Sequence, residues 1–187
     1  MVRNCDAVGI NEMHVTPGEN SLRTHWNTSQ GAEKWVYIRT HNSVEDSCVH
    51  LKSTGFRLVA ADLSDKATDF RDVDYTQATA LVMGSELFGV SDETLSFVDQ
   101  QISIPMMGVT QSLNVSVACA IVLYEAQRQR QAAGMYDQCR LDDETLARQR
   151  FEWLHPVLTT YCKKHRLRYP SLDESGDLAE AMPRATP

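Results

Sequence analysis

The sequence lacks several features that would assign it to common functional classes. In its 187 residues no apolar run approaches the ~20 residues needed to cross a bilayer, and the first residues lack the pattern of a signal peptide. There is no G-x-G-x-x-G motif after a strand, which argues against a nicotinamide-binding oxidoreductase. These absences predict a globular cytoplasmic protein, long enough to bury a substantial core.

Cysteine is present in a pattern that builds neither a metal site nor a disulfide framework. The five cysteines are scattered, odd in number and without a C-x-x-C pair. This usage favours a reducing compartment, so we expect no bound metal and mainly structural thiols. The residues are Cys5, Cys48, Cys119, Cys139 and Cys162.

Positive charge is also scarce. The 18 Lys and Arg residues are outnumbered by 25 Asp and Glu, which gives a formal net charge of −7. Because Lys and Arg contacts with phosphates supply most non-specific affinity for nucleic acids, this balance is unusual for an RNA-binding protein. Basic residues nevertheless cluster at Arg128 and Arg130 and again from Lys163 to Arg168. Two interpretations stay open: a local RNA-binding face, or a solvated surface of mixed charge.

The sequence does contain a regular alternation of apolar runs and helical segments. Strands are predicted at 12–15, 35–38, 56–61, 78–83 and 102–105. Helices are predicted at 3–7, 43–53, from Ser91 onward, from 113 or 114 to 133, and from 142 to 162 with a break near Pro156. This order predicts an α/β fold with a mainly parallel sheet and helices on both faces.

Three regions are expected along the chain. Residues 1–134 form the α/β domain, and residues 135–170 form a C-terminal helical extension. Residues 171–187 carry many charges and few apolar side chains, so we predict a disordered tail.

Two of the predicted strands end in loops that carry polar side chains. The first is Leu81-Val-Met-Gly-Ser-Glu-Leu-Phe-Gly-Val90, and the second runs from Ile102 through Pro105 to Ser-Leu-Asn at 112–114. Open α/β folds bind ligands outside the carboxyl ends of their strands. Glu86, Ser112 and Asn114 are therefore candidate catalytic residues. Ser112 and Asn114 are equally suited to capping the following helix, and the two roles can coexist.

These segments resemble the signature motifs of the SpoU class of RNA 2′-O-ribose methyltransferases, in the SPOUT superfamily. G-S-E-x-x-G at 84–89 is similar to the second motif, and I-P-M-x-G-x-x-x-S-L-N-V-S-V-A at 104–118 is similar to the third. Arg3-Asn-Cys-Asp-Ala-Val-Gly9 resembles the end of the first. The segments 124–136 and 156–170 resemble the branch that modifies a guanosine in the tRNA D-loop.

The resemblance implies a C-terminal deep trefoil knot, a homodimer and S-adenosylmethionine as the cofactor. It also implies that Arg3 activates the ribose hydroxyl, that Glu86 orients Arg3 or a ribose hydroxyl, and that Ser112 and Asn114 bind the nucleotide or the loop. The pKa of a guanidinium lies above about 12, so the group stays protonated under ordinary conditions. Arg3 could equally hold the phosphate beside the target ribose, with the proton passing to that phosphate or to water.

The resemblance also implies two sets of binding residues. Ile104 and Leu113 on their own would be interpreted as core residues, but the motif context favours a cofactor pocket, in which Gly84 and Gly108 allow close backbone approach or unusual dihedral angles. The cofactor-binding residues are Ala61, Met83, Gly84, Ile104, Met106 and Leu113. The RNA-binding residues are Arg23, Arg128, Arg130, Lys163, Lys164 and Arg166.

The first motif is incomplete in this chain. The class pattern has an Asn six residues before the Arg, preceded by a strand and a helical region, whereas Met1 stands two residues before Arg3. We expect the chain to lack the first strand, to bind the cofactor and to methylate poorly, because a short helix with few contacts is marginal. The predicted function is 2′-O-methylation of a guanosine in the tRNA D-loop. Alternatives are a ribosomal-RNA methyltransferase of the same class and a non-catalytic RNA- or cofactor-binding remnant.

Overall fold

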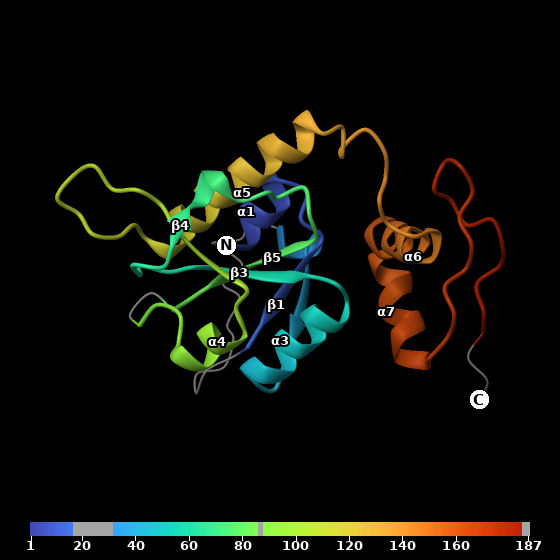
Figure 1. Ribbon diagram of the computed structural model, residues 1–187. Coiled ribbons are helices and arrows are strands. Elements are labelled where there is room, and N and C mark those ends of the chain that lie inside the picture. The colour runs from blue at the N-terminus through green and yellow to red at the C-terminus, as the bar shows by residue number, and fades with distance from the viewer. Residues whose placement is uncertain (17–31, 86–87, 185–187) are drawn as a thin grey trace. The chain divides into compact units, whose positions relative to one another are not determined.

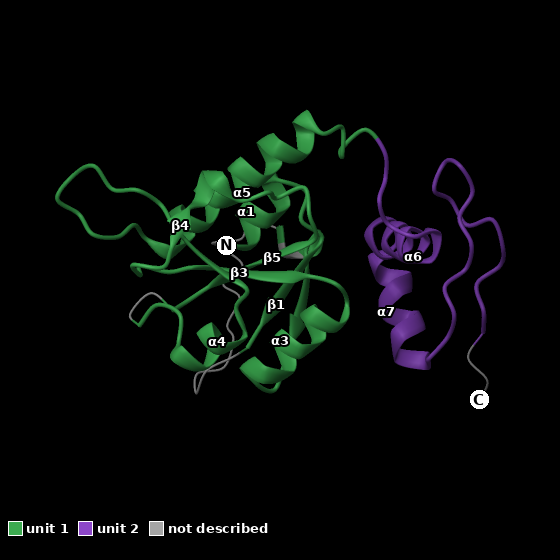
Figure 2. Cartoon of the chain, viewed as in Figure 1, with its two compact units in different colours: residues 1–137 green, residues 138–187 purple. Residues whose placement is uncertain are grey.

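The computed structural model describes residues 1–16, 32–85 and 88–184. The chain forms two compact units, residues 1–137 and residues 138–187 (Figure 2). The boundary lies three residues beyond the predicted end of the α/β domain.

Unit 1 is built on parallel strands. β3 (Arg57–Ala61), β5 (Thr79–Met83), β6 (Gln100–Ser103) and β4 (Thr68–Asp69) form a sheet in the order β4-β6-β3-β5, and every pairing is parallel. β1 (Glu12–Val15) and β2 (Tyr37–Thr40) form a separate parallel pair. The predicted parallel sheet is confirmed. β2 begins two residues later than predicted, because Trp35 and Val36 donate backbone hydrogen bonds to Ala32 in a turn.

Helices lie on both sides of this sheet. α1 (Val2–Ala7) and α5 (Val115–Ala132) lie on one side, and α3 (Val44–Ser53) and α4 (Asp92–Phe97) lie on the other (Figure 1). The predicted caps are confirmed, since Ser43 accepts a hydrogen bond from the Asp46 N–H and Ser91 accepts one from the Thr94 N–H. Two short 3-10 helices, η1 (Ala32–Lys34) and η2 (Phe70–Asp72), complete the described elements of unit 1.

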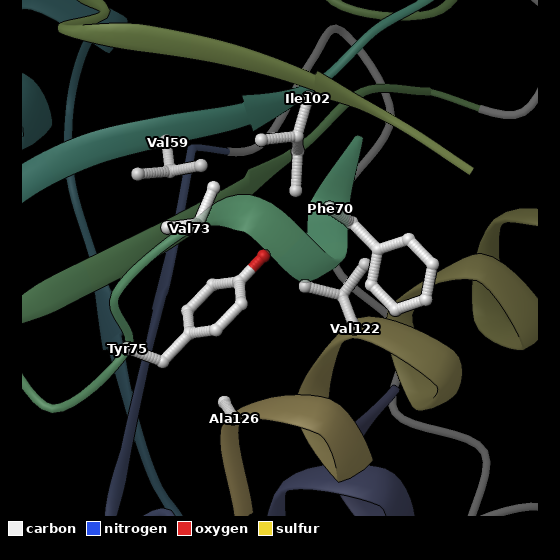
Figure 3. Close-up of a cluster of buried hydrophobic side chains, with 7 residues drawn as sticks. All are labelled: Val59, Phe70, Val73, Tyr75, Ile102, Val122 and Ala126. Carbon is white, nitrogen blue, oxygen red and sulfur yellow. The ribbon is translucent and has the colours of Figure 1, made fainter. Parts of the chain in front are cut away.

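The core of unit 1 consists of two clusters that share α5. One cluster joins the sheet to α5 through the segment after η2 (Figure 3), and its residues are Val59, Phe70, Val73, Tyr75, Ile102, Val122 and Ala126. The other joins α1 to α5, and its residues are Cys5, Val8, Val36, Cys119 and Leu123. Burial of apolar surface therefore fixes α5 on the sheet and α1 on α5.

Unit 2 contains two helices around one buried aromatic ring. α6 (Asp143–Leu154) is capped by Asp142, and α7 (Pro156–His165) begins at the proline where a break was predicted. Phe151 is buried, and its ring stacks on Tyr169 with the centroids 4.6 Å apart.

Residues 171–184 follow a folded path, although their composition predicts a disordered tail. Leu172 and Leu178 form an antiparallel bridge, and the Ala179 N–H donates to the Ser171 carbonyl. The Glu180 carboxylate accepts hydrogen bonds from the Ser171 N–H and from Arg168. Composition underestimates order here because the acidic residues accept local hydrogen bonds instead of only facing solvent.

No helix in the described ranges is long and apolar enough to cross a membrane.

Candidate active site

The carboxyl ends of three neighbouring strands meet at one edge of the sheet. Ala61, at the end of β3, pairs with Met83 at the end of β5 and with Ile102 of β6. The Asp62 N–H continues this edge with a 3.0 Å hydrogen bond to the Ile102 carbonyl. The structure therefore brings Ala61 and Met83 together with the strand that leads into Ile104, where parallel sheets bind their ligands. Ile104 is half-buried and packs against the core, as expected for a core residue, and its place in a cofactor pocket stays a prediction.

The loop after β5 is closed tightly on itself at Gly84. A Cβ atom added to Gly84 would lie 2.0 Å from the carbonyl carbon of Gly89 and 2.3 Å from the Val90 nitrogen. Ser85 and Gly89 exchange backbone hydrogen bonds of 2.9 and 3.0 Å. The predicted close backbone approach is confirmed at Gly84. It is wrong for Gly108, which has no atom within 4 Å of an added Cβ and no positive φ.

The loop that carries the third motif is exposed. The connection between β6 and α5 extends away from the sheet (Figure 1). Met107 and Val109 have exposed fractions of 98% and 102%, and Ser112 is exposed as well. Met106 and Leu113 are half-buried. Within the loop the Thr110 hydroxyl donates a 3.0 Å hydrogen bond to the Ser112 carbonyl, so Ser112 contributes its backbone to the loop and leaves the hydroxyl for other contacts.

Asn114 caps α5. Its Oδ1 accepts a 2.9 Å hydrogen bond from the Ser116 N–H, and its carbonyl accepts hydrogen bonds from Val117 and Ala118. The capping role that the sequence left open is confirmed for Asn114, and Ser112 lies two residues before the cap.

The helix that carries Arg3 packs against α5. Arg3 is exposed on α1, and the neighbouring Asn4 Nδ2 donates a 2.7 Å hydrogen bond to the Ser116 carbonyl, across 112 positions of sequence. Below them Cys5 is buried, and burial together with the nearby Cys119 raises the pKa of the Cys5 thiol to about 11. The structure thus brings the first and third motifs together at the start of α5. Two candidates, Glu86 and Arg23, lie outside the described residues.

The sequence analysis did not single out Asn4. Its side chain makes a hydrogen bond between the first and third motifs across 112 positions, yet helical periodicity cannot distinguish it from a solvated polar residue. The available signal was its place directly after Arg3, since a polar amide at that position can fix a helix on a neighbouring backbone.

Two of the candidate RNA-binding arginines have partners within unit 1. Arg130 Nε donates a 2.9 Å hydrogen bond to the Tyr75 carbonyl, which fixes the segment after η2 on α5. Arg128 forms an ion pair with Glu125 at 2.7 Å, and its hydrogen bonds lower the pKa of that carboxyl. The Arg128 side chain is 67% exposed and can still reach solvent, whereas Arg130 is half-buried.

The basic residues of unit 2 gather at the end of α7. Lys163 forms a 3.0 Å ion pair with Glu152, whereas Lys164 and Arg166 are exposed. Arg166 has a left-handed backbone with φ of 53° and ends the helix. Positive charge here also complements the negative end of the helix dipole. The exposed ring of Tyr161 lies 4.6 Å from that of His165 on the same helix.

Three histidines form a further group in unit 1. The rings of His14, His41 and His50 lie with centroids 5.0 to 5.6 Å apart, and His14 Nδ1 is 2.8 Å from His41 Nε2. Burial lowers the pKa of His14, against an opposing effect of Glu12. Among the residues that the structure describes, no group of three or more His, Cys, Asp or Glu side chains is arranged to hold a metal ion.

Two models of known protein families match this chain. Residues 1–124 match the model of the SpoU rRNA methylase family, and residues 128–181 match the model of the SpoU rRNA methylase C-terminal region. The chain belongs to the SpoU methylase family. The two matched regions of this SpoU protein correspond closely to unit 1 and unit 2.

Relatives extend the match over nearly the whole SpoU chain. This chain is 43% identical over 180 residues to the tRNA (guanosine(18)-2′-O)-methyltransferase of Escherichia coli strain K12. The alignment covers 95% of this chain and 79% of that enzyme. Among solved structures, the Aquifex aeolicus TrmH/SpoU tRNA modifying enzyme aligns with a TM-score of 0.74 and 39% identity, covering 89% of this chain and 81% of the other.

A third relative concerns the cofactor. The SpoU methyltransferase AviRb from Streptomyces viridochromogenes, solved in complex with AdoMet, aligns with a TM-score of 0.62 and 30% identity. The alignment covers 70% of this chain and 54% of AviRb. The predicted membership of the SpoU class is therefore confirmed, and the family uses S-adenosylmethionine.

Proposed function

We propose that this SpoU protein transfers a methyl group from S-adenosylmethionine to the 2′-hydroxyl of a guanosine ribose in the D-loop of tRNA. The observation that carries the proposal is the meeting of the first and third motifs at the start of α5, made by the Asn4–Ser116 hydrogen bond. The identity of 43% to the Escherichia coli enzyme over 95% of the chain supports tRNA as the substrate. A cytoplasmic location accords with that substrate.

The strand ends of unit 1 suit the cofactor. Backbone groups at Ala61 and Met83 offer donors and acceptors to an adenosine, and the half-buried Ile104 and Leu113 offer apolar surface. The tight Gly84 loop borders the same edge. Most small-molecule sites combine apolar walls with a few polar groups in this way. When bound there, S-adenosylmethionine supplies a methyl group on a positively charged sulfur.

We assign Arg3 to the phosphate beside the target ribose. Arg3 is exposed, and a guanidinium presents several donors in a planar fork, so it is suited to binding an anion such as phosphate. The hydroxyl proton would pass to that phosphate or to water as the ribose oxygen takes the methyl group and the methyl–sulfur bond of the donor breaks, which leaves a neutral thioether. Ser112 and Asn114 would hold the nucleotide through the hydroxyl and the amide, and Glu86 would orient Arg3 or a ribose hydroxyl. Correct placement of these groups can supply about 7–11 kcal/mol of the barrier reduction.

A homodimer with a deep trefoil knot would explain the exposed apolar residues of unit 1. Phe88, Met107 and Val109 have exposed fractions of 87%, 98% and 102%, all in the loops of the second and third motifs. Apolar residues grouped in this way mark interaction sites. In the knot the third-motif loop passes through the loop that follows β5, and in the dimer a second copy covers both loops. We expect Met107→Asp with Val109→Asp to yield a monomer in light scattering; a dimer of unchanged mass would contradict this assembly.

The end of α7 is proposed as a tRNA contact. Lys164 and Arg166 are exposed, and the Tyr161–His165 pair offers rings on which a base can stack. Arg128 and Lys163 have side chains that are 67% and 62% exposed, and they would exchange their ion pairs with Glu125 and Glu152 for phosphates. Arg23 belongs to the same proposed set.

Transfer of a labelled methyl group separates the proposed function from its alternatives. The protein is incubated with labelled S-adenosylmethionine and with either tRNA or ribosomal RNA, and the modified nucleotide is located by mass spectrometry. We expect 2′-O-methylguanosine in the D-loop of tRNA. Label in ribosomal RNA alone would favour the ribosomal alternative, and cofactor binding without transfer to either RNA would indicate a non-catalytic protein.

A further inference from the structure

The helix that carries Arg3 needs help to hold its orientation. α1 has six residues and no side-chain hydrogen bond at its N-terminal cap. Helices of this length are marginal in water, so their direction depends on tertiary contacts. Because Arg3 is exposed on this helix, any rotation of α1 moves the guanidinium relative to the third motif.

Two kinds of contact hold α1 on α5. Cys5 and Val8 are buried in the same cluster as Cys119 and Leu123. Apolar contacts of this kind are not directional, so they allow the helix to rotate or slide. The directional contact with α5 is the half-buried Asn4 side chain, whose Nδ2 donates to the Ser116 carbonyl at 2.7 Å. At the other end of α1 the Tyr136 hydroxyl donates to the Val8 carbonyl at 2.9 Å. Burial raises the pKa of the neighbouring Cys119 thiol, and the N-terminal amino group and the Asn4 side chain partly offset that rise.

The acceptor of the Asn4 hydrogen bond belongs to the third motif. Ser116 donates its N–H to the Asn114 side chain at 2.9 Å and accepts the Asn4 amide through its carbonyl. A single residue of α5 therefore connects Asn4 to Asn114. The bonded path runs from Arg3 to Asn4 through the backbone, and from Asn4 through Ser116 to Asn114 by two hydrogen bonds.

We infer that Asn4 is a positioning residue for the methyl transfer, which holds Arg3 at a fixed place relative to Asn114 without touching the substrate. The kinetic effect expected of Asn4 rests on the proposed function, whereas the Asn4–Ser116 hydrogen bond is independent of it. The side chain fixes the helix through its N–H donor. An isosteric carboxylate at this position would place an acceptor against the Ser116 carbonyl and would repel it.

The kinetic test uses Asn4→Ala and Asn4→Asp, with Asn42→Ala as the matched control. Asn42 is an exposed Asn of the same unit. We expect the Asn4 variants to lower kcat by roughly 10- to 100-fold, because a misplacement of about 1 Å can cost that much. KM for tRNA and the affinity for S-adenosylmethionine should stay within about twofold of their values in the protein without substitutions. The Asn42→Ala control should match that protein in all three quantities.

A double-substitution cycle distinguishes positioning from a general structural role. If Asn4 acts through Arg3, Asn4→Ala causes no further loss of single-turnover rate in an Arg3→Ala background. An equal loss in both backgrounds would overturn the inference. Retention of full kcat by Asn4→Asp would overturn it as well.

A measurement without catalysis keeps this inference separate from the proposed function. Hydrogen–deuterium exchange should increase at the amides of α1 in Asn4→Asp and stay unchanged in β3 and β5. If the unchanged protein transfers no methyl group to tRNA, the proposed function fails, and the exchange data still decide whether Asn4 orients the helix. Unchanged exchange in α1 would refute the positioning role.

Discussion

Gly84 lies so close to Gly89 that a Cβ atom on Gly84 would stand 2.0 Å from the Gly89 carbonyl carbon. The loop after β5 therefore closes only when residue 84 has no side chain. Because this loop follows Met83 at the edge assigned to the cofactor, its closure determines the shape of that edge.

We expect Gly84→Val to weaken S-adenosylmethionine binding by at least about 10-fold, since the loop must open to admit the side chain. Affinity for tRNA should change far less. Isothermal titration calorimetry measures the first and filter binding the second. Gly108→Val is the control, because a Cβ at Gly108 meets no atom within 4 Å. Equal cofactor affinities for both variants and the unchanged protein would remove the Gly84 loop from the binding site.

The Arg130–Tyr75 contact should contribute to stability. Arg130 Nε donates to the Tyr75 carbonyl, and the Gln129 side chain accepts from the Tyr75 N–H at 2.9 Å. Arg130→Met leaves the carbonyl without its charged donor, so we expect the free energy of unfolding to fall by about 1.5–3 kcal/mol. Urea denaturation measures this. Arg128→Met should change stability less, because the Arg128 side chain is 67% exposed and Gln129 still donates a hydrogen bond to the Glu125 carboxylate. An Arg130 variant as stable as the Arg128 variant would show that the contact is dispensable.

Neutralising the end of α7 should alter the salt dependence of tRNA affinity. If Lys164 and Arg166 contact phosphates, replacing each by Gln should reduce the slope of log affinity against log salt by about 1. Fluorescence anisotropy at several salt concentrations gives the slope. Arg71→Gln is a suitable control, because that side chain is hydrogen-bonded to Asp69. A slope that does not change would mean that the charges at the end of α7 are only solvated.

The histidine group predicts a dependence of stability on pH. The pKa of His14 lies below its ordinary value in the folded protein, because of burial and then of the neighbouring His41, Arg39 and His50, with Glu12 acting in the opposite direction. The unfolded chain therefore binds more protons near this site, and stability falls as the pH drops below the ordinary histidine pKa of about 6.5. The contribution is fully present above that value.

Replacing His14 by Asn should make the unfolding free energy less dependent on pH between about 7.5 and 5. Parallel urea titrations of the two proteins at several pH values measure the difference. His165→Asn, a substitution of an exposed histidine of unit 2, should leave the dependence unchanged. Parallel curves for the His14 variant and the unchanged protein would contradict a lowered pKa at His14.

The sequence predicted the elements of unit 1 well where local signals determine them. Ser43, Ser91 and Asn114 cap the helices that begin after them, and the parallel strands follow the apolar runs. Caps and periodicity depend on residues a few positions apart, so a single sequence contains them. The motifs likewise placed Ala61 and Met83 at one edge, and their paired register confirms this.

The contacts that decide the roles of individual side chains could not be predicted from the sequence. Arg130 remains a predicted phosphate contact, and the sequence could not show that it also donates a hydrogen bond to Tyr75, which lies 55 positions earlier. Residues 171–184 looked disordered, but Glu180 accepts the hydrogen bonds that organise them. Such pairings depend on which segments meet in space, and neither propensity nor charge pattern specifies that.

The Asn4–Ser116 hydrogen bond also bears on the order in which the molecule is completed. Its two partners are separated by 112 positions, so α1 leaves the ribosome long before the start of α5 exists to receive it. Contacts of such sequence separation form late, because the intervening chain must first be ordered. α1 is therefore among the last elements to be fixed, and a nascent chain that ends before Ser116 holds the Arg3 motif without the backbone that aligns it.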